Sequence, residues 1–317
     1  SMLTDWLKAM NAALEDPDIG YYYAKKKVLA DIMIMIIDSA TSQVFKFKQG
    51  KGKDAVNLEM SSLEYYSRFG FVIFDECHEH ANKFALKALK NAQARYMMGL
   101  SATPDENTKK DYDLLVWWEL GPVLDASKVP GYEATSEVYK ATVHRMMYYG
   151  PAEYTKHLVN EKIQTVDSAN TINMLCEDRI RNELIIDCVK RGLDKGLYMF
   201  VFTDRREYAD NLRQMLKDYL DIEGEVLADE KDFVRIVGGA TDQEFAEAEQ
   251  KARAIFTTYP YMGTGKSIIK MNGLVLAHPR KSKMKQYIGR IFRLGSDRSI
   301  ERHIWDICDM KISVKNQ

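Results

Sequence analysis

A run of four apolar residues followed directly by acidic ones constrains the fold more than any other stretch of the sequence. Phe71–Phe74 has the length and composition of a strand buried on both faces, as inside a parallel sheet, and Asp75, Glu76, Cys77 and His78 follow it. Ligands of open α/β sheets bind beyond the carboxyl ends of the strands. One carboxylate there can hold Mg²⁺ while the other polarises an attacking water. The alternative is a solvated strand end without a function.

Short apolar runs alternate with helical patterns along most of the chain, which predicts an α/β fold with parallel sheets. Strands are expected at residues 32–37, 71–74, 96–100, 139–149, 197–202, 234–237, 254–258 and 274–277. Helices are expected at residues 3–14, 63–68, 81–91, 178–191, 204–219, 241–251 and 283–294. The length of 317 residues and a linker-like stretch at 121–136 predict two domains, residues 1–136 and 137–317.

Polar residues mark the ends of three helices expected in the second domain. Asp178 is placed to cap a helix that would stop at Gly192. Asp204 and Glu207 resemble a capping pair for the next helix, and Thr241 opens a capping box.

Composition and charge limit the compartment and the partners. The net charge of −1 means that any nucleic-acid surface must be local. The four cysteines show no paired short spacing, so we expect a reducing compartment such as the cytoplasm. Cys77, His78 and His80 are too few neighbouring donors to indicate a metal site. The apolar run at 32–37 is too short to span a bilayer and no secretion signal opens the sequence, so neither a membrane partner nor secretion is expected.

A second cluster of polar residues follows the strand expected at 96–100. Ser101, Ala102 and Thr103 precede a proline, which predicts a compact polar turn. A strand, a helix and a second parallel strand bring two strand ends side by side, so this turn is expected beside Asp75 and His78. The alternative is an ordinary turn.

Arginines three residues apart form the third candidate site. Arg290 and Arg293 would share one face of a helix, and Gln286 would lie on the same face. Guanidinium groups aimed in one direction match the oxygens of a triphosphate. The alternative is a solvated basic face. The run Lys25–Lys27 leaves the same choice open, between a solvated edge and phosphate contact.

Residues 262–267 resemble the end of a phosphate-binding P-loop, but we reject that interpretation. The loop requires a glycine five residues before its final glycine, and Pro260 stands in that position relative to Gly265. No other part of the sequence carries the P-loop pattern.

Taken together, these motifs resemble those of superfamily 2 nucleic-acid helicases of the DExH kind. Asp75-Glu76-Cys77-His78 resembles the metal and hydrolysis motif, and Ser101-Ala102-Thr103 resembles the Ser-Ala-Thr coupling motif. Residues 257–279 and 286–293 resemble two later motifs of the family, the second being Gln-x-x-Gly-Arg-x-x-Arg. The second half is most similar to helicases of large DNA viruses and phages, which adds the virion as an alternative compartment.

The resemblance implies an ATP-dependent helicase or translocase with two RecA-like parallel-sheet domains in tandem, the first truncated at its N-terminus. ATP and Mg²⁺ would be its cofactors. Asp75 would hold Mg²⁺, Glu76 would activate water, and Arg290 and Arg293, assisted by Gln286, would contact the γ-phosphate. The partner would be DNA or RNA, as a single strand or duplex junction, and a monomer is favoured.

The resemblance also implies roles outside the catalytic set. His78, Ser101 and Thr103 would couple nucleotide state to nucleic-acid binding. Four residues would touch backbone phosphate: Ser39, Thr203, Gly238 and Thr258. Gly265 and Ser267 would contact the nucleotide, although relatives often carry an acid where Ser267 stands.

Three hypotheses for the function remain open, and the missing P-loop favours the third of them for this chain. In the family this loop precedes the acidic motif, so the chain is expected to begin after it and to hydrolyse ATP feebly by itself. The longer protein could be a strand-separating helicase or a translocase that does not unwind. The third possibility is a non-catalytic nucleic-acid-binding module with a vestigial nucleotide site.

Overall fold

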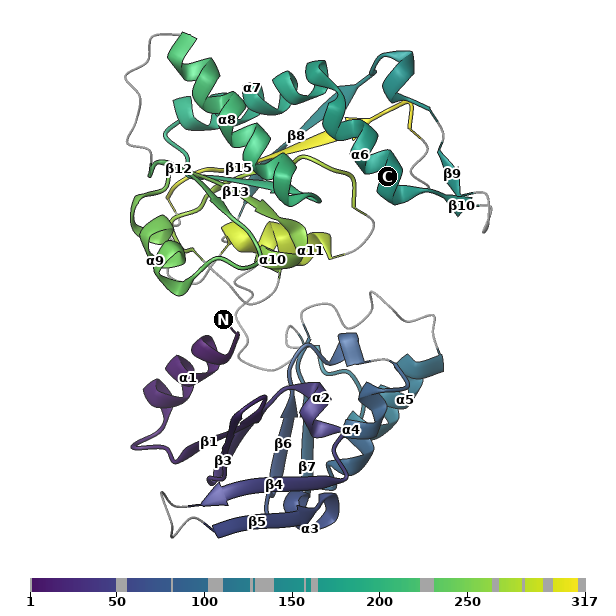
Figure 1. The fold of residues 1–317 in the computed structure, drawn as a ribbon, viewed down its shortest axis with the longest axis vertical. Coiled ribbons are helices and arrows are strands. Elements are labelled where there is room, and N and C mark those ends of the chain that lie inside the picture. Colours follow the sequence, from purple (N-terminus) through teal and green to yellow (C-terminus); the bar gives the residue numbers. More distant parts are fainter. Residues whose placement is uncertain are drawn as a thin grey trace. The chain divides into compact units, whose positions relative to one another are not determined.

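The chain forms two compact units in the computed structural model, Ser1–Glu133 and Ala134–Gln317 (Figure 1). The structure describes residues 2–49, 56–80, 82–101, 111–125, 128, 140–156, 158–160, 165–222, 231–263, 268–280, 283–292 and 299–312. Within these residues, no helix has both the length and the apolar character needed to cross a bilayer.

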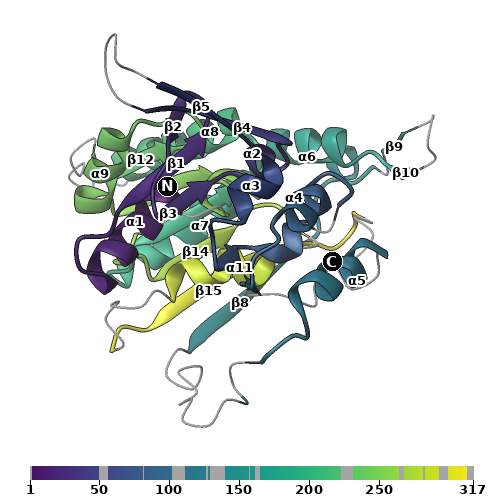
Figure 2. The same ribbon diagram turned by 90° about the horizontal axis from the view of Figure 1, so that it is seen from below.

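The first unit combines short helices with three small sheets. Its helices are α1 (Met2–Ala13), α2 (Ile37–Ala40), α3 (Ser62–Tyr66), α4 (Ala85–Asn91), α5 (Asp111–Leu120) and the 3₁₀ helix η2 (Cys77–His80). Its strands are β1 (Ile19–Tyr23), β2 (Lys26–Val28), β3 (Ile32–Met35), β4 (Val44–Gln49), β5 (Val56–Ser61), β6 (Phe71–Phe74) and β7 (Tyr96–Gly99). Strands β2, β1 and β3 lie side by side in that order (Figure 2). β4 pairs antiparallel with β5, and β6 pairs parallel with β7.

Aromatic side chains dominate the core of the first unit. The rings of Phe45 and Tyr65 stack with centroids 4.0 Å apart, and Tyr22 meets Phe45 edge-on at 5.0 Å. The β4–β5 hairpin that supplies Phe45 was not among the expected strands. Its alternation of lysine and phenylalanine is nevertheless typical of a strand with one solvated face.

Strand β6 is less buried than its sequence predicts. Phe71 is 52% exposed and Ile73 is 40% exposed, whereas Phe74 is buried. The prediction that both faces are buried was therefore wrong. Among the described strands β6 pairs only with β7, and only the face that carries Val72 and Phe74 packs on the core.

The second unit is built on one six-stranded parallel sheet. Its strands follow the order β12 (Phe233–Ile236), β13 (Ala254–Thr258), β11 (Met199–Thr203), β14 (Gly273–Leu276), β15 (Arg302–Asp309) and β8 (Ala141–Tyr148). Every neighbouring pair is parallel. A separate two-stranded ribbon joins β9 (Val159–Asn160) to β10 (Thr165–Val166).

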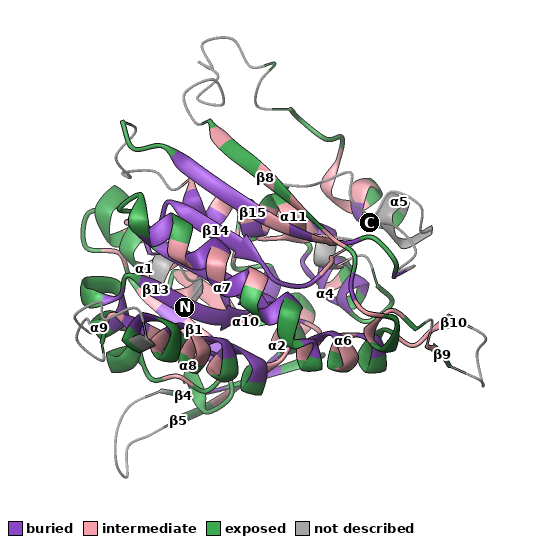
Figure 3. Ribbon diagram, turned by 90° about the horizontal axis from the view of Figure 1, so that it is seen from above, coloured by how far each residue is buried: buried purple, intermediate pink, exposed green. Residues whose placement is uncertain are grey.

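Helices cover both faces of this sheet, as a doubly wound fold requires. They are α6 (Ser168–Glu177), α7 (Arg179–Asp194), α8 (Arg206–Ile222), α9 (Asp242–Lys251), α10 (Tyr259–Gly263), α11 (Met284–Ile288) and the 3₁₀ helices η5 (Ala152–Tyr154) and η6 (Gly289–Ile291). Met199 and Val201 pack toward α7 and α8, while Phe200 and Phe202 pack toward α10 and α11. Figure 1 shows these helix pairs on opposite sides of the sheet, and Figure 3 shows β13, β14 and β15 buried. The central strands β11, β13 and β14 are apolar except for the threonines at the carboxyl ends of β11 and β13, because both of their faces are covered.

Helix ends in the second unit confirm some predictions and correct others. The side chain of Asp178 accepts a hydrogen bond from the Arg181 amide, and Thr241 forms a complete capping box. Helix α7 runs past Gly192 to Asp194, because the left-handed turn that ends it lies at Gly196, with φ +73°. The side chain of Asp204 pairs with Arg280 rather than capping α8.

The helix expected at 283–294 is shorter than predicted. It ends as an α-helix at Ile288 and continues as one 3₁₀ turn to Ile291. Strand β15 follows it and was absent from the expected elements. Its sequence includes Arg302, His303 and Asp309, which are buried here and which no apolar pattern would mark as a strand.

Candidate active site

Asp75, at the end of β6, accepts two hydrogen bonds from within the first unit. Its Oδ2 accepts from the indole Nε1 of Trp6 at 2.9 Å, and its Oδ1 accepts from the amide of Glu76 at 2.9 Å. Trp6 lies on α1, so that helix is tied directly to the acidic motif. Sequence reasoning assigned Trp6 only to an apolar helix face, because no local pattern reveals a contact across 69 residues.

Glu76 has a backbone conformation that is uncommon for a residue with a side chain. Its φ of +49° lies in the left-handed region, which costs about 1–3 kcal/mol for a residue other than glycine. The carboxylate Oε2 lies 3.5 Å from Nδ1 of His78. The turn therefore holds the Glu76 carboxylate beside the imidazole.

His78 links the carboxyl ends of β6 and β7, as the order strand, helix, strand predicts. Its Nδ1 lies 2.8 Å from Oγ of Ser101, which follows β7. The amide of Cys77 donates to the carbonyl of Leu100 at 2.9 Å, so a backbone hydrogen bond also joins the segments that follow β6 and β7. Burial raises the pKa of the Cys77 thiol, with the nearby carboxylates adding to this effect. Thr103 lies outside the described residues.

The residues of the acidic turn fit one Mg²⁺ ligand position rather than a full metal cage. Each carboxylate oxygen of Asp75 offers two lone-pair directions and accepts one of these two hydrogen bonds, which leaves capacity for a cation. Among the described residues no group of three or more histidine, cysteine or carboxylate side chains could hold a metal ion. Mg²⁺ commonly takes one or two carboxylates and completes its shell with water and phosphate oxygens.

The arginine motif lies in the second unit. Gln286 is half-buried on α11, whereas Arg290 is only 6% exposed and lies in η6. The change from α to 3₁₀ geometry at Gly289 means that Gln286 and Arg290 do not lie on one continuous α-helix, as was expected. Arg293 lies outside the described residues, as do Gly265 and Ser267.

The expected phosphate contacts differ in exposure. Ser39 is half-buried on α2, and Gly238 follows β12. A Cβ at Gly238 would lie 2.7 Å from a terminal guanidinium nitrogen of Arg206, the far end of a flexible side chain that can move aside. Thr203 and Thr258 are buried, and the Thr203 hydroxyl donates to the carbonyl of Arg205 at 2.9 Å. A direct phosphate contact would require the Thr203 side chain to become exposed.

A polar cluster at the carboxyl ends of β11 and β14 was missed by sequence reasoning. Asp204 forms an ion pair with Arg280, whose guanidinium lies 4.6 Å from the ring centroid of Tyr259. Burial raises the pKa of Asp204, although Arg280 and Arg205 oppose this shift. The only available signal was the position of Asp204 and Arg280 just after expected strands.

Buried His278 belongs to the same cluster and predicts a pH dependence of stability. Its Nδ1 accepts from the amide of Asp204 at 3.1 Å. Burial, reinforced by Arg181, Arg205 and Arg280, lowers the pKa of His278 well below 6.5. Below pH 6.5 the unfolded chain binds a proton at this histidine that the folded chain does not bind. The free energy of unfolding therefore decreases as the pH is lowered. We expect a loss of about 1.4 kcal/mol between pH 7.5 and 5.5, measured by urea denaturation.

The variant His278→Asn is the control for this pH dependence, because it cannot titrate in this range. We expect its stability to fall less than that of the parent chain over the same interval. Other histidines, including His144, whose pKa is lowered by burial and by His303, contribute equally to both chains. Equal pH slopes in the two chains would contradict the prediction.

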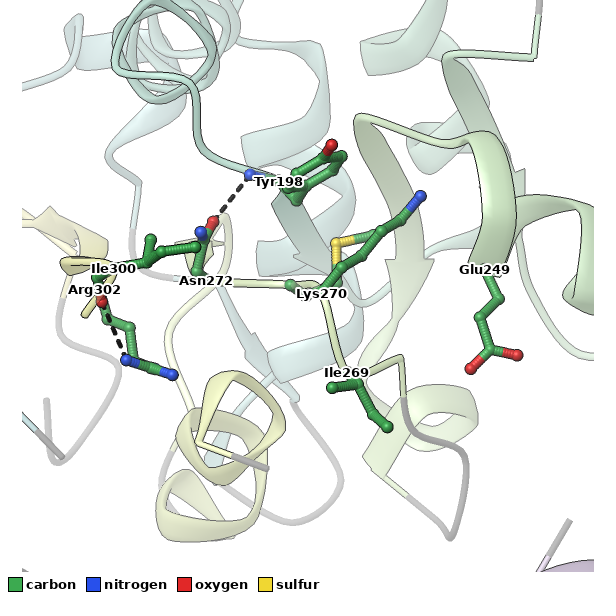
Figure 4. Close-up of a pocket in the computed structure, with 8 residues that line it drawn as sticks. Tyr198, Glu249, Ile269, Lys270, Asn272, Ile300 and Arg302 are labelled. Carbon is green, nitrogen blue, oxygen red and sulfur yellow. Dashed lines mark hydrogen bonds between the residues drawn. The ribbon is translucent and has the colours of Figure 1, made fainter. Parts of the chain in front are cut away.

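A hollow of about 340 Å³ opens at the opposite edge of the second unit's sheet (Figure 4). Its wall includes Tyr198, Asn272 and Arg302, which lie at the amino-terminal ends of β11, β14 and β15. The ammonium of Lys270 lies 5.0 Å from the Tyr198 ring centroid. The nucleotide motifs follow carboxyl ends, so this hollow is not the site that they predict.

Comparison with known proteins defines the class. Residues 1–106 match the family described as type III restriction enzyme, res subunit. The solved structure of the helicase MrfA bound to DNA superposes with a TM-score of 0.59 at 14% identity, covering 96% of this chain and 38% of that one. This structural likeness shows the fold of tandem RecA-like units. The sequence matches support a superfamily 2 helicase related to those of viruses and phages.

More particularly, the chain is related to helicases of viruses and phages. A protein of African swine fever virus (strain Badajoz 1971 Vero-adapted), whose name describes an ATP-dependent RNA helicase, is 26% identical over 269 residues. That alignment covers 80% of this chain and 50% of the viral protein. The ATP-dependent DNA helicase uvsW of Enterobacteria phage T4 is 24% identical over 257 residues, covering 78% and 47%. The chain thus spans about half the length of these curated relatives.

Proposed function

We propose that this chain is the core of an ATP-dependent helicase or translocase that acts on DNA or RNA. The observation that carries the proposal is the acidic turn, where Asp75 and Glu76 adjoin a histidine that reaches the next strand end at Ser101. The naming of viral and phage relatives as ATP-dependent helicases supports it. A monomer in a reducing compartment fits the composition.

Each residue of the turn has a separate role in this proposal. Asp75 holds Mg²⁺, which neutralises phosphate charge. The Glu76 carboxylate orients the attacking water and accepts its proton. The backbone turn at Glu76 keeps its carboxylate within reach of His78. Because His78 also contacts Ser101, the position of the end of β6 depends on that of the end of β7.

The second unit contributes the positive charge and part of the nucleic-acid surface. In this proposal the γ-phosphate is contacted by Arg290, Arg293 and Gln286. The rest of the nucleotide is contacted by Gly265 and Ser267. Changes in nucleotide state would then drive movement along one strand. Because the sequence contains no complete P-loop signature, we expect this chain by itself to hydrolyse ATP feebly.

Nucleic-acid-stimulated hydrolysis by the full-length protein tests the proposal. Coupling between two sites commonly changes affinity by about 5- to 150-fold, and we expect single-stranded nucleic acid to raise ATP turnover by about tenfold. The measurement is phosphate release with and without the oligonucleotide. A protein that binds neither ligand would contradict the proposal.

A non-catalytic nucleic-acid-binding module is the second candidate, favoured by the missing P-loop signature. It predicts oligonucleotide binding without nucleotide binding. A titration of the longer protein with a fluorescent ATP analogue separates the two candidates, because only the first requires saturable nucleotide binding.

A further inference from the structure

We propose that the β1–β2 hairpin of the first unit binds single-stranded nucleic acid. In this proposal Tyr21 and Tyr23 stack on bases, and Lys25, Lys26 and Lys27 contact phosphates. The inference rests on the proposed function for its class of partner. It adds to that function a specific contact surface that includes Lys25–Lys27, for which the sequence left phosphate contact open.

The hairpin presents two tyrosine rings on one face. Gly20 and Tyr22 of β1 are buried, whereas Tyr21 and Tyr23 alternate with them and are half-buried. The rings of Tyr21 and Tyr23 lie 6.0 Å apart with an interplanar angle of 85°. In an edge-to-face pair the ring that contributes its edge keeps both of its faces clear of its partner. A π-face of this kind can stack on any base, whatever the sequence.

Three consecutive lysines follow these rings in the hairpin. Lys26 lies opposite Tyr23, whereas Lys27 lies opposite Tyr22, with its ammonium 5.0 Å from that ring's centroid. The chain turns at Ala24, with φ +46°, and Lys25, Lys26 and Lys27 are all exposed. The Lys26 ammonium lies 5.9 Å from the ring centroid of Tyr23. Across the described parts of the chain, no carboxylate forms an ion pair with any of the three lysines. Their charge is therefore available to an anionic ligand.

Strand β4 extends the basic surface. It packs beside β2 (Figure 2), and its Lys46 amide donates to the hydroxyl of Tyr22 at 3.1 Å. Lys46 and Lys48 are exposed, although Lys46 forms a 3.0 Å ion pair with Glu59. Lys46 and Lys48 alternate with Phe45 and Phe47, which pack on Tyr22, so their charges lie on the outer face of β4. Lysines are thus concentrated on β2 and β4 of a chain whose net charge is −1. Charge complementarity therefore selects a polyanion.

The combination of rings and charges favours a single strand over a duplex. Bases of a duplex are stacked inside the helix, whereas bases of a single strand can reach an aromatic platform. Lysines on an edge strand such as β2 also discourage further sheet pairing. That role alone would not require the tyrosine rings, and it would not produce salt-dependent binding.

Charge removal tests the phosphate contacts. The triple variant Lys25→Gln, Lys26→Gln, Lys27→Gln of the 317-residue chain is titrated with fluorescein-labelled oligothymidylate at several salt concentrations. Each phosphate contact contributes about 0.7 to the slope of log K against log salt for single strands, so we expect the slope to fall by about 2. The matched control, Lys83→Gln, Lys87→Gln, Lys90→Gln, removes the same charge from exposed sites around α4 and should leave the slope unchanged.

Ring removal tests stacking independently of charge. The double variant Tyr21→Leu, Tyr23→Leu should weaken oligothymidylate binding about tenfold, with the salt slope and duplex binding unchanged. Tyr21→Phe, Tyr23→Phe keeps both rings and should restore affinity. If the leucine variant loses its thermal unfolding transition, the phenylalanine variant and the lysine triple variant still decide the question.

The outcomes separate this inference from the proposed function. If the parent chain binds the oligonucleotide and the lysine and tyrosine variants bind it equally well, the hairpin is excluded while the proposed function stands. If the parent chain binds no nucleic acid, both are overturned for this chain. A lower salt slope in the lysine variant together with weaker binding in the leucine variant supports the inference.

Discussion

Replacing Glu76 with glutamine is expected to reduce ATP turnover by the longer protein about 10²–10⁴-fold, the range typical of a lost general base. The amide preserves the shape of the side chain but cannot accept a proton from water. The strained turn at Glu76 and the 3.5 Å approach to His78 hold the carboxylate in place, so no neighbouring group substitutes for it without movement. Phosphate release under saturating ATP measures the effect, and nucleotide binding should be retained.

A second substitution in the same unit controls for charge. Glu59 lies on β5 with its side chain 59% exposed, paired with Lys46. Glu59→Gln changes the charge as Glu76→Gln does, yet it should leave turnover close to that of the parent. If Glu76→Gln retained more than about a tenth of the parent rate, Glu76 would be excluded as the base, since a tenfold change corresponds to only about 1.4 kcal/mol of barrier.

Removing the carboxylate of Asp309 is expected to destabilise the second unit by about 3–5 kcal/mol. Arg181 is fully buried, and its guanidinium donates to both carboxylate oxygens of Asp309 at 2.7 and 2.8 Å and to the carbonyl of Ala277 at 2.7 Å. Asp309→Ala leaves this positive charge buried without its counter-ion. Urea denaturation gives the free-energy change, and hydrogen exchange in β14 and β15 assigns it to this unit.

Two variants separate the cost of an unpaired charge from the loss of packing. Arg181→Met combined with Asp309→Leu removes both charges and should be less destabilised than Asp309→Ala, because nothing charged remains buried. Glu183→Ala breaks an exposed 2.9 Å pair with Arg179 and should cost about 0.5 kcal/mol or less. If Asp309→Ala were as mild as Glu183→Ala, the buried pair would contribute little to stability.

Much of the second unit follows from short sequence patterns. Strands β11, β13 and β14 are continuous apolar runs, and the caps at Asp178 and Thr241 are encoded within a few residues. The proximity of Ser101 to His78 also followed, because parallel strands joined by one helix end at the same edge. These features depend on neighbours in sequence or on strand order alone.

Other features depended on partners distant in sequence. Strand β15 escaped prediction because its buried arginine, histidine and aspartate are accommodated by groups from other segments, among them Arg181 for Asp309 and the carbonyl of Ile291 for Arg302. The role of Asp204 was misread because its side chain meets Arg280, 76 residues away. Exposure of β6 was misread because an apolar run does not specify how many strands pair beside it.

The amino-acid sequence by itself therefore determined the α/β class, most strands of the parallel sheet and the acidic turn with its histidine. Each is a local consequence of side-chain polarity and backbone preference. Only the tertiary structure decided which charged groups are buried in pairs and that Trp6 binds Asp75. The reason is physical: a polar group's free energy depends on the partner that folding brings to it, and local sequence does not encode that partner.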